Sequence, residues 1–212
     1  MSSMGRAGKV RVERRLMTAR HGARLLDRKQ RILADELERL QLRAELARTE
    51  WEELSREAAL WLRRAAALDG SARIEEAAPL EPAGLQLRWG STMGVVYPEY
   101  PECQLPAAPA AGGSSALSYA AAVHRSALAA GVRYAAVQRA EVLLATERAA
   151  TRTRQRAVEN RWIPRLENEL QDIRRQLDAQ ELEESLRLRW AADRSSGNTA
   201  RPALGAARKG AS

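Results

Sequence analysis

Apolar residues recur in alternating steps of three and four along the first third of the chain. The series begins at Leu16 and ends at Leu68, and only Gln30 interrupts it. Its positions are Leu16, Ala19, Ala23, Leu26, Gln30, Leu33, Leu37, Leu40, Ala44, Ala47, Trp51, Leu54, Ala58, Trp61, Ala65 and Leu68. A mean step of 3.5 residues keeps one stripe of a helix against a partner, as in a left-handed coiled coil. The pattern predicts one long helix over residues 9–69, which needs a second helix to cover its seam.

The pattern changes after Asp69-Gly70, where a glycine follows the last periodic residue and is expected to end the helix. Leu85, Leu87 and Trp89 then alternate with polar residues, which is the period of a strand. Gly90-Ser91-Thr92 has the composition of a turn, and residues 93–97 return as a second strand. We predict an insert over residues 70–117, with a β-hairpin at 84–97 and a Pro-, Ala- and Gly-rich loop at 98–115.

A second helical pattern follows over residues 118–190. Its clearest apolar positions are Ile163, Leu166, Leu170, Ile173 and Leu177, and upstream positions are mostly Ala. Because Gln180 and Glu184 fall on this seam, we expect it to shift to Leu182 and Leu186. Pro164 lies inside the helix, lacks a backbone N–H and crowds the preceding turn, which predicts a bend near Glu159–Asn160.

The fold class that follows is all-α: a long antiparallel two-helix coiled coil with a short β-hairpin and loop insert in the middle. The chain reverses at the insert, so the first helix pairs with the second, and the two termini meet at one tip. Residues 1–8 and 191–212 are rich in small and polar residues and are expected to be disordered. The dominance of Ala, Leu, Arg and Glu and the absence of Phe favour long helices over a globular core.

The formal net charge of +8 is concentrated at the two ends of the chain. Residues 1–31 hold ten Lys and Arg against two acids, and residues 191–212 hold four against one. Basic ends indicate an acidic partner, a nucleic acid, or merely solvated tails. Antiparallel helices would combine these charges into one positive tip. The basic residues of this tip are Lys9, Arg11, Arg14, Arg15, Arg20, Arg187 and Arg189.

Candidate chemistry is sparse, and we expect no catalytic site, no cofactor site and no metal site. Gly112-Gly113-Ser114-Ser115 lacks the lysine of a phosphate-binding loop and is better explained as a linker. His21 and His124 are the only histidines, and neither has cysteines or paired carboxylates at ligand spacing. Cys103 is the single cysteine, so an internal disulfide is excluded, and this favours a reducing cytosolic setting. No activating basic motif surrounds Cys103, so a reactive nucleophile is not expected.

Two further groups of residues have structural explanations. Trp51 and Trp61 fall on the seam and are expected in the core. An acid-rich run has interleaved arginines, which favours a salt-bridged, solvated face over acid–base catalysis. The acids of this run are Glu167, Glu169, Asp172, Asp178, Glu181, Glu183 and Glu184. There is no apolar run of about 20 residues that would span a bilayer, and no signal peptide is recognised.

Three stretches resemble one family, the D subunits of the rotary V-type and A-type ATPases, which form the central stalk. The first is Arg15-Leu16 through Ala19, Gly22, Leu25-Leu26 and Lys29. The second is Met93-Gly94-Val95 followed by Pro98. The third is Glu159-Asn160-Arg161-Trp162-Ile163-Pro164-Arg165-Leu166-Glu167-Asn168, then Ile173, Leu177, Gln180-Glu181, Glu183-Glu184 and Leu186-Arg187-Leu188. Together the stretches cover most of residues 9–190.

The resemblance implies a non-catalytic rotor shaft that couples ATP hydrolysis or synthesis to proton or sodium transport. The implied partners are the catalytic A subunits and nucleotide-binding B subunits of a ring, the small F subunit of the stalk, and a socket subunit on the membrane rotor ring. The implied location is the cytoplasmic face of a membrane, as a peripheral part of a membrane-bound complex. Neither membrane insertion nor direct nucleic-acid binding is implied.

Two hypotheses and two rival functions follow. The positive tip would meet acidic loops in the ring, and the hairpin around Met93-Gly94-Val95 would tune the ATPase rate. One rival is a basic, nucleic-acid-associated coiled coil, which the pI of about 10.4 favours. The slightly acidic middle and the lack of a basic stripe with aromatics argue against it. The other rival is a scaffold protein that dimerises through its seam.

Overall fold

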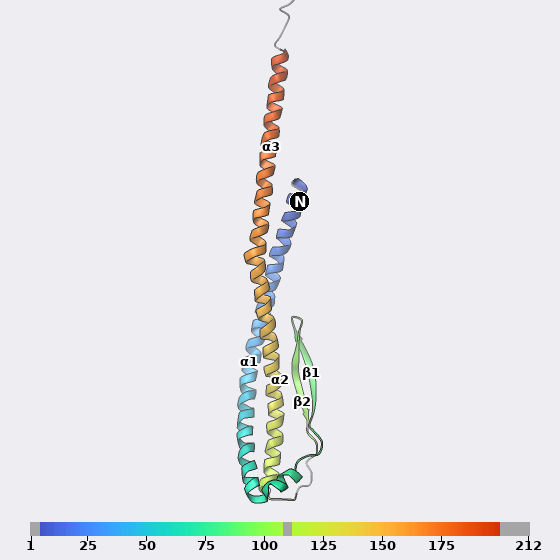
Figure 1. Ribbon diagram of the computed structural model, residues 1–212, viewed down its shortest axis with the longest axis vertical. Helices are drawn as coiled ribbons and strands as arrows, with labels where there is room; N and C mark the ends of the chain where they lie inside the picture. The colour runs from blue at the N-terminus through green and yellow to red at the C-terminus, as the bar shows by residue number, and fades with distance from the viewer. Residues whose placement is uncertain (1–4, 108–111, 200–212) are drawn as a thin grey trace, which may run out of the picture. The chain divides into compact units, whose positions relative to one another are not determined.

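The structure is a computed structural model that describes residues 5–107 and 112–199, with side chains through residue 194. Long helices account for most of the described chain, and a two-stranded antiparallel sheet lies between them in sequence (Figure 1). This confirms the predicted fold class. The chain forms two compact units, which we call the central unit (residues 24–155) and the terminal unit (residues 1–23 and 156–212).

The first helix, α1 (Arg6–Glu76), carries the predicted seam. Its buried seam residues are Leu16, Ala23, Leu33, Leu37, Leu40, Ala44, Ala58 and Ala65. Two predicted core positions are wrong, because Trp51 is 37% exposed and Leu68 is 69% exposed. Leu68 lies in the last turn before Gly70, where the paired part of the helix ends. Trp51 packs on Gly131 and stacks on the Tyr134 ring, which leaves part of its side chain exposed.

The backbone leaves helical geometry at Gly70, with φ of 79° and ψ of 167°, and a short helical segment then continues to Glu76. The position of this break was predicted, since glycine adopts positive φ without a steric cost. Asp69, the preceding residue, accepts hydrogen bonds from the backbone N–H and the hydroxyl of Ser114. The end of α1 is therefore tied to the start of the next long helix.

The hairpin consists of β1 (Gly84–Thr92) and β2 (Val95–Gln104), paired antiparallel. The predicted turn at residues 90–92 is wrong, because these residues belong to β1. The turn is Met93-Gly94, and both residues have positive φ, 50° and 84°. This is the backbone of a two-residue type I′ turn, whose twist matches the twist of the two strands, and glycine favours its second position.

The second strand is longer than predicted and takes up residues 98–104 of the expected loop. Proline is tolerated in this strand because each strand of a two-stranded ribbon has one edge that faces no other strand. A residue on that edge can lack an N–H without loss of a hydrogen bond between the strands. The pairing shifts between Arg88 and Trp89, whose partners are Tyr100 and Pro98, so Glu99 is the extra residue of a β-bulge. A Cβ at Gly90 would lie 2.6 Å from a Glu99 carboxylate oxygen, so a larger residue here would displace the end of the Glu99 side chain.

The second long helical stretch comprises α2 (Ser115–Ala157), a π-helical turn η1 (Val158–Trp162), and α3 (Ile163–Thr199). It starts at Ser115 rather than 118, because the Ser114 hydroxyl caps it by accepting the N–H of Leu117. The π-helical turn η1 lies just before Pro164, where an irregularity was expected. The backbone N–H of Ile163, which follows η1, donates to the Val158 carbonyl. A π turn keeps the helix continuous across a proline. The bend itself stays a prediction.

Both ends of the chain are more helical than predicted. Residues 6–8 belong to α1, and residues 191–199 belong to α3. The helix-forming pair Ala191-Ala192 lets α3 continue where a disordered tail was expected. The remaining parts of the two predicted disordered segments, 1–4 and 200–212, lie outside the described residues.

Candidate functional site

The terminal unit is built on a small apolar core between α1 and α3. Val12 and Leu16 pack against three residues of the predicted second seam, Leu166, Leu170 and Ile173. Ion pairs flank this core and join the two helices in antiparallel order. They are Arg6–Glu181 at 3.2 Å, Glu13–Arg174 at 3.3 Å and Arg20–Glu167 at 2.7 Å. Because these pairs are exposed, each contributes at most about 1 kcal/mol, and the apolar core contributes more.

Within the described residues, most of the net positive charge of the terminal unit comes from α1. Residues 5–23 hold six basic residues and one acid, whereas residues 163–194 hold six basic residues and eight acids. The side chains of Arg11, Arg14 and Arg15 are exposed. The predicted positive tip therefore needs a correction. Arg187 pairs with Glu183 of its own helix.

The pairing of Arg6 with Glu181 explains the correction. It places Arg187 and Arg189 farther along α3 than the described start of α1. They do not join the basic residues of α1. Leu182 and Leu186 are 63% and 43% exposed, so the predicted shift of the seam to them is wrong within the described residues. Together with exposed Leu188 and Trp190, they give this end of α3 an uncovered apolar surface.

In the central unit, Tyr97 anchors the hairpin to the helical pair. Its side chain is 5% exposed and lies in a cluster with Leu33, Leu37 and Leu144. Its hydroxyl donates to Glu36 Oε1 at 3.3 Å, and Thr92 Oγ1 lies 3.1 Å from the same hydroxyl. Burial, with the nearby Glu36 carboxylate as a lesser cause, raises the pKa of the Tyr97 hydroxyl. The hydroxyl therefore stays protonated and keeps its hydrogen bonds. Sequence analysis missed this anchor.

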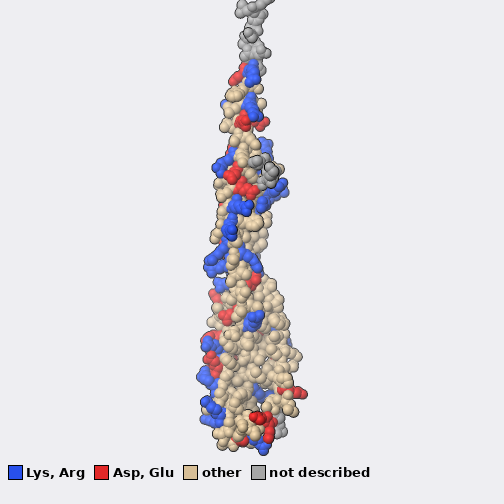
Figure 2. All heavy atoms as spheres, in the orientation of Figure 1, with Lys and Arg blue, Asp and Glu red and all other residues tan. Residues whose placement is uncertain are grey.

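The rest of the hairpin presents an apolar surface to solvent. Leu85, Trp89 and Val96 are 55%, 61% and 56% exposed. A broad face almost free of charged residues lies on the hairpin side of the central unit (Figure 2). An exposed apolar surface of this kind is a candidate contact site for another chain.

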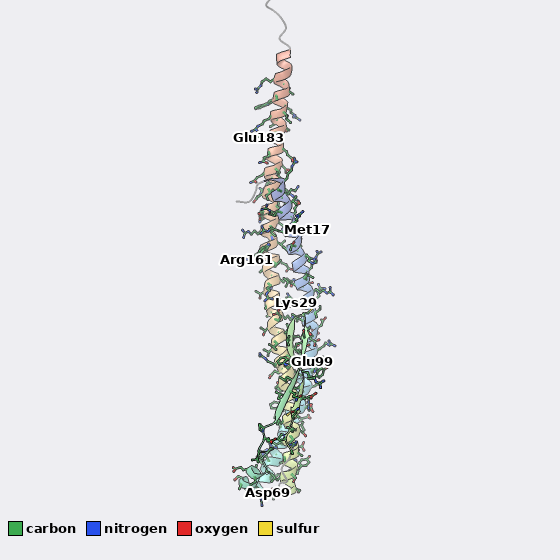
Figure 3. The ribbon with its side chains drawn as sticks, turned by 90° about the vertical axis from the view of Figure 1, so that its right-hand side faces the viewer. Met17, Lys29, Asp69, Glu99, Arg161 and Glu183 are labelled. Carbon is green, nitrogen blue, oxygen red and sulfur yellow. The ribbon has the colours of Figure 1, made fainter. Side chains whose placement is uncertain are left out.

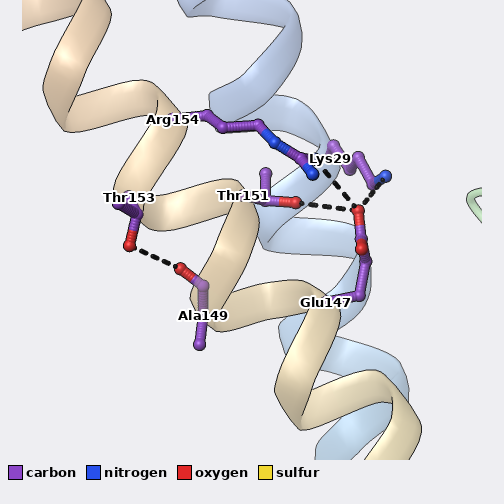
Figure 4. A network of polar contacts seen from close by, with 6 residues as sticks. All are labelled: Lys29, Glu147, Ala149, Thr151, Thr153 and Arg154. Atoms are coloured by element: carbon purple, nitrogen blue, oxygen red, sulfur yellow. Dashed lines mark hydrogen bonds and ion pairs between the residues drawn. The ribbon is translucent and has the colours of Figure 1, made fainter.

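A cluster of polar side chains interrupts the apolar seam between α1 and α2 (Figure 4). Lys29 Nζ lies 2.7 Å from Glu147 Oε1, to which the fully buried Thr151 hydroxyl donates at 3.4 Å. Arg154 approaches the same oxygen at 3.5 Å. Next to this group, the Gln30 side-chain amide donates to that of Gln155. These six residues, Lys29, Gln30, Glu147, Thr151, Arg154 and Gln155, are called the polar layer below.

The hydrogen bond from Lys29 holds the pKa of the Glu147 carboxyl below its usual range, in spite of the opposing effect of desolvation. Lys29 and Glu147 are 23% and 27% exposed, so they are only partly screened by solvent. The sequence signalled this site only through Gln30, the one polar residue on the seam.

A second candidate contact site is an apolar pocket of about 460 Å³ in the central unit. Its walls come from the end of α1, the segment after it, the residues that follow β2, and the start of α2. Among the residues that line it are Leu62, Ile74, Leu105, Leu117, His124 and Arg125. Arg125 donates to the Pro106 carbonyl, which holds the wall formed by the insert against α2.

The residues considered for chemistry belong to three different elements. His21 is exposed, whereas His124 Nδ1 lies 2.8 Å from the Ala120 carbonyl of its own helix. Cys103 is a partly buried free thiol in β2. Within the described ranges, no three His, Cys, Asp or Glu residues are grouped so that they could hold a metal. The expectation that the chain has no catalytic site stays a prediction.

The explanations given for the acid-rich run and for Trp61 hold. Glu167, Glu181 and Glu183 pair with Arg20, Arg6 and Arg187. The predicted salt-bridged face is thereby confirmed. Trp61 is partly buried beside the Tyr119 ring, at a centroid distance of 4.6 Å, and Arg64 lies over its face.

The fold and these surfaces define a class of protein: an antiparallel two-helix coiled coil with a docked hairpin, whose candidate sites are contact surfaces. In the part of the chain that is described, no helix is long and apolar enough to cross a membrane. The model of one family, that of the D subunit of ATP synthase, matches residues 9–193. The chain therefore belongs to the family of ATP synthase D subunits. Members of this family are structural stalk subunits of rotary ATPases and are not themselves catalytic. A search of curated proteins finds no match.

Proposed function

We propose that this chain is the central shaft of a rotary ATPase and that it couples ATP hydrolysis or synthesis to proton or sodium transport. The observation that carries the proposal is the family match over residues 9–193, which extends across both helices and the hairpin. The helical pair supports it on physical grounds. A shaft must resist twisting, and two interlocked helices tied by cross-helix ion pairs do so better than one.

The terminal unit is the part proposed to enter the ring of catalytic and nucleotide-binding subunits. Exposed Arg11, Arg14 and Arg15 offer positive charge to acidic loops, and exposed Leu182 and Leu186 offer an apolar contact. Exposed charges attract over several ångströms without a fixed geometry. Such contacts suit a surface that turns against its bearing.

The central unit is proposed to carry the other stalk partners, namely the small F subunit and the socket subunit on the membrane rotor ring. Its uncovered apolar surfaces are the outer face of the hairpin, with Leu85 and Trp89, and the pocket beside Leu117. On this proposal the chain is a peripheral component at the cytoplasmic face of the membrane. The hairpin would tune the ATPase rate, and a chain lacking residues 84–104 that hydrolyses ATP at the wild-type rate in the complex would contradict that role.

The test of the proposed function is the native mass and composition of the complex that a tagged copy captures from its own cells. One copy with a ring of nucleotide-binding subunits and a small stalk partner is the expected result. A complex rich in nucleic acid, with steep salt dependence, would instead support the basic coiled-coil alternative. A free homodimer would support the scaffold alternative.

A further inference from the structure

Apart from Trp51, which packs on Gly131 and stacks on Tyr134, the apolar seam between α1 and α2 contains little information about register. Along α2, buried Ala116, Val123, Ala130, Val137 and Leu144 are spaced seven residues apart. Along α1 the seam repeats with the same period. A slip of one heptad therefore places apolar residues against apolar residues again. Six of the buried seam residues of α2 are alanines, and their small side chains penalise such a slip only slightly. They are Ala116, Ala120, Ala127, Ala130, Ala136 and Ala140.

The two ends of the paired region in the central unit differ from this seam. One end is held by Asp69, whose carboxylate accepts from Ser114 at the start of α2. The other end is held by the polar layer, where Lys29 meets Glu147. Lys29 and Asp69 lie at opposite ends of the central unit (Figure 3). The polar layer is thus far along the helices from the connection that joins them.

The charges of the polar layer match in the observed register and in neither neighbouring one. If α2 slips by one heptad in one direction, Lys29 faces Arg154 instead of Glu147. Glu147 then faces Glu36 instead of Lys29. Both new pairs have like charges. A slip in the other direction places Lys29 opposite the uncharged Ala140. It places Glu147 opposite Gly22, which lies seven residues before Lys29. Neither charge would then meet an opposite charge at the equivalent position.

We propose that the polar layer is a register lock, which allows α1 and α2 to pair in one register only. A partly buried charge without a partner, or against a like charge, is strongly unfavourable, whereas replacing both partners by apolar residues costs little. The layer therefore contributes specificity rather than stability. Single polar positions in coiled-coil seams set register in the same way. The lock concerns the helical pair itself, so it holds whether or not the chain is a rotary shaft.

The test exchanges the two charges on α2, in the variant Glu147→Lys with Arg154→Glu. In the observed register this variant sets Lys29 against the new lysine at position 147. In the slipped register it pairs Lys29 with the new glutamate at position 154, and it pairs the new lysine with Glu36. Spin labels at exposed Arg43→Cys and Arg152→Cys, with Cys103→Ser, report the register by electron–electron distance measurement in the full chain. A one-heptad slip displaces the helices by about 10 Å along their axes.

Three matched variants make the result decisive. Adding Lys29→Glu to the exchange restores opposite charges in the observed register, and the wild-type distance should return. Asp27→Arg with Arg31→Asp exchanges an exposed pair on α1 and should leave the distance unchanged. If the exchange variant does not fold, Lys29→Leu with Glu147→Leu replaces it, and both registers should be populated in a chain that melts no lower than wild type. A single wild-type distance in the exchange variant, or in the leucine variant when the exchange variant does not fold, would overturn the proposal.

Discussion

At the scale of single residues, one large side chain fits against the second helix because a small residue faces it. Trp51 stacks on Tyr134 at a ring-centroid distance of 5.6 Å, and Gly131 lies beneath its indole. A Cβ at Gly131 would lie 3.0 Å from Trp51 Nε1 and 3.1 Å from its Cδ1. Glycine in a helix interior weakens the helix by about 1 kcal/mol, and here close packing is the compensation.

Gly131→Ala should therefore be less favourable than the same change at Gly22, where a Cβ meets nothing within 4 Å. Both variants gain helix propensity, but Gly131→Ala also overpacks the indole, which costs about 1–3 kcal/mol. We expect urea denaturation to place Gly131→Ala at least about 1 kcal/mol below Gly22→Ala in stability. Equal effects would mean that Trp51 moves aside without cost.

Glu147→Gln tests the electrostatics of the polar layer. The pKa of Glu147 is lower in the folded chain than in the unfolded chain, so its ionised form stabilises the fold above the ordinary carboxyl range. That contribution is lost as the pH falls through the folded pKa. The variant should be about 1 kcal/mol less stable than wild type at pH 7, and the difference should shrink as the pH falls below the ordinary carboxyl range and disappear below the folded pKa.

The control for this pH dependence is Asp172→Asn, which removes an exposed ion pair with Arg175 on α3. It should change the stability by less than about 0.5 kcal/mol throughout the same pH range. A Glu147→Gln difference that stays constant from pH 7 to pH 3 would contradict the assigned charge state.

Sequence reasoning located most residues of the seam, because a period of 3.5 is visible without any knowledge of the partner. It misplaced Trp51, since the period alone cannot distinguish a central position from one at the side of a wide aromatic contact. It also treated Gln30 as a defect. The partners of the polar layer lie more than 100 residues away in the sequence, and no local pattern connects Lys29 with Glu147.

At the scale of elements, the hairpin is held by few side chains although it spans two long strands. Tyr97 is buried, whereas almost all of β1 is exposed. The composition predicted the presence of a hairpin but placed its turn too early. The pair Met93-Gly94 forms the turn because the glycine accepts positive φ, whereas Gly90 lies within β1, close to the Glu99 side chain.

Tyr97→Ala should release the hairpin from the helices. Truncating a buried aromatic side chain costs about 3–5 kcal/mol, whereas Tyr97→Phe removes only the hydroxyl and its hydrogen bonds, at about 1 kcal/mol. Hydrogen exchange of the amides of β1 and β2 should become much faster in Tyr97→Ala and only slightly faster in Tyr97→Phe. Unchanged exchange in Tyr97→Ala would show that other contacts hold the hairpin.

At the scale of the whole molecule, the sequence predicted that the two long helices pair and that positive charge gathers near the ends of the chain. It did not predict the relative lengths of the helices. The extension of α3 to Thr199 and the pairing of Arg6 with Glu181 leave Arg187 beyond the described start of α1. The net positive charge of the paired part of the terminal unit therefore lies on α1. A count of the charges at each end of the sequence could not show this, because it does not reveal how far α3 extends past the start of α1.

The proposed contact of the terminal unit with the ring predicts a charge effect. Arg11→Glu, Arg14→Glu and Arg15→Glu together should weaken assembly with the ring by at least about tenfold, or about 1.4 kcal/mol, because attraction becomes repulsion. Coupled ATPase activity should fall with it. The same three reversals at exposed Arg43, Arg56 and Arg139 of the central unit are the matched control and should leave assembly unchanged. Equal assembly of both variants would remove the proposed role of the α1 charges.

The central claim is that this chain turns, and rotation is its most direct measurement. A bead attached through a single introduced cysteine at Arg43, with Cys103→Ser, would report the motion of the chain in a surface-held complex during ATP hydrolysis. We predict continuous rotation in one direction that stops when ATP is removed. A bead that only fluctuates about a fixed angle, on complexes that hydrolyse ATP at the normal rate, would contradict the account.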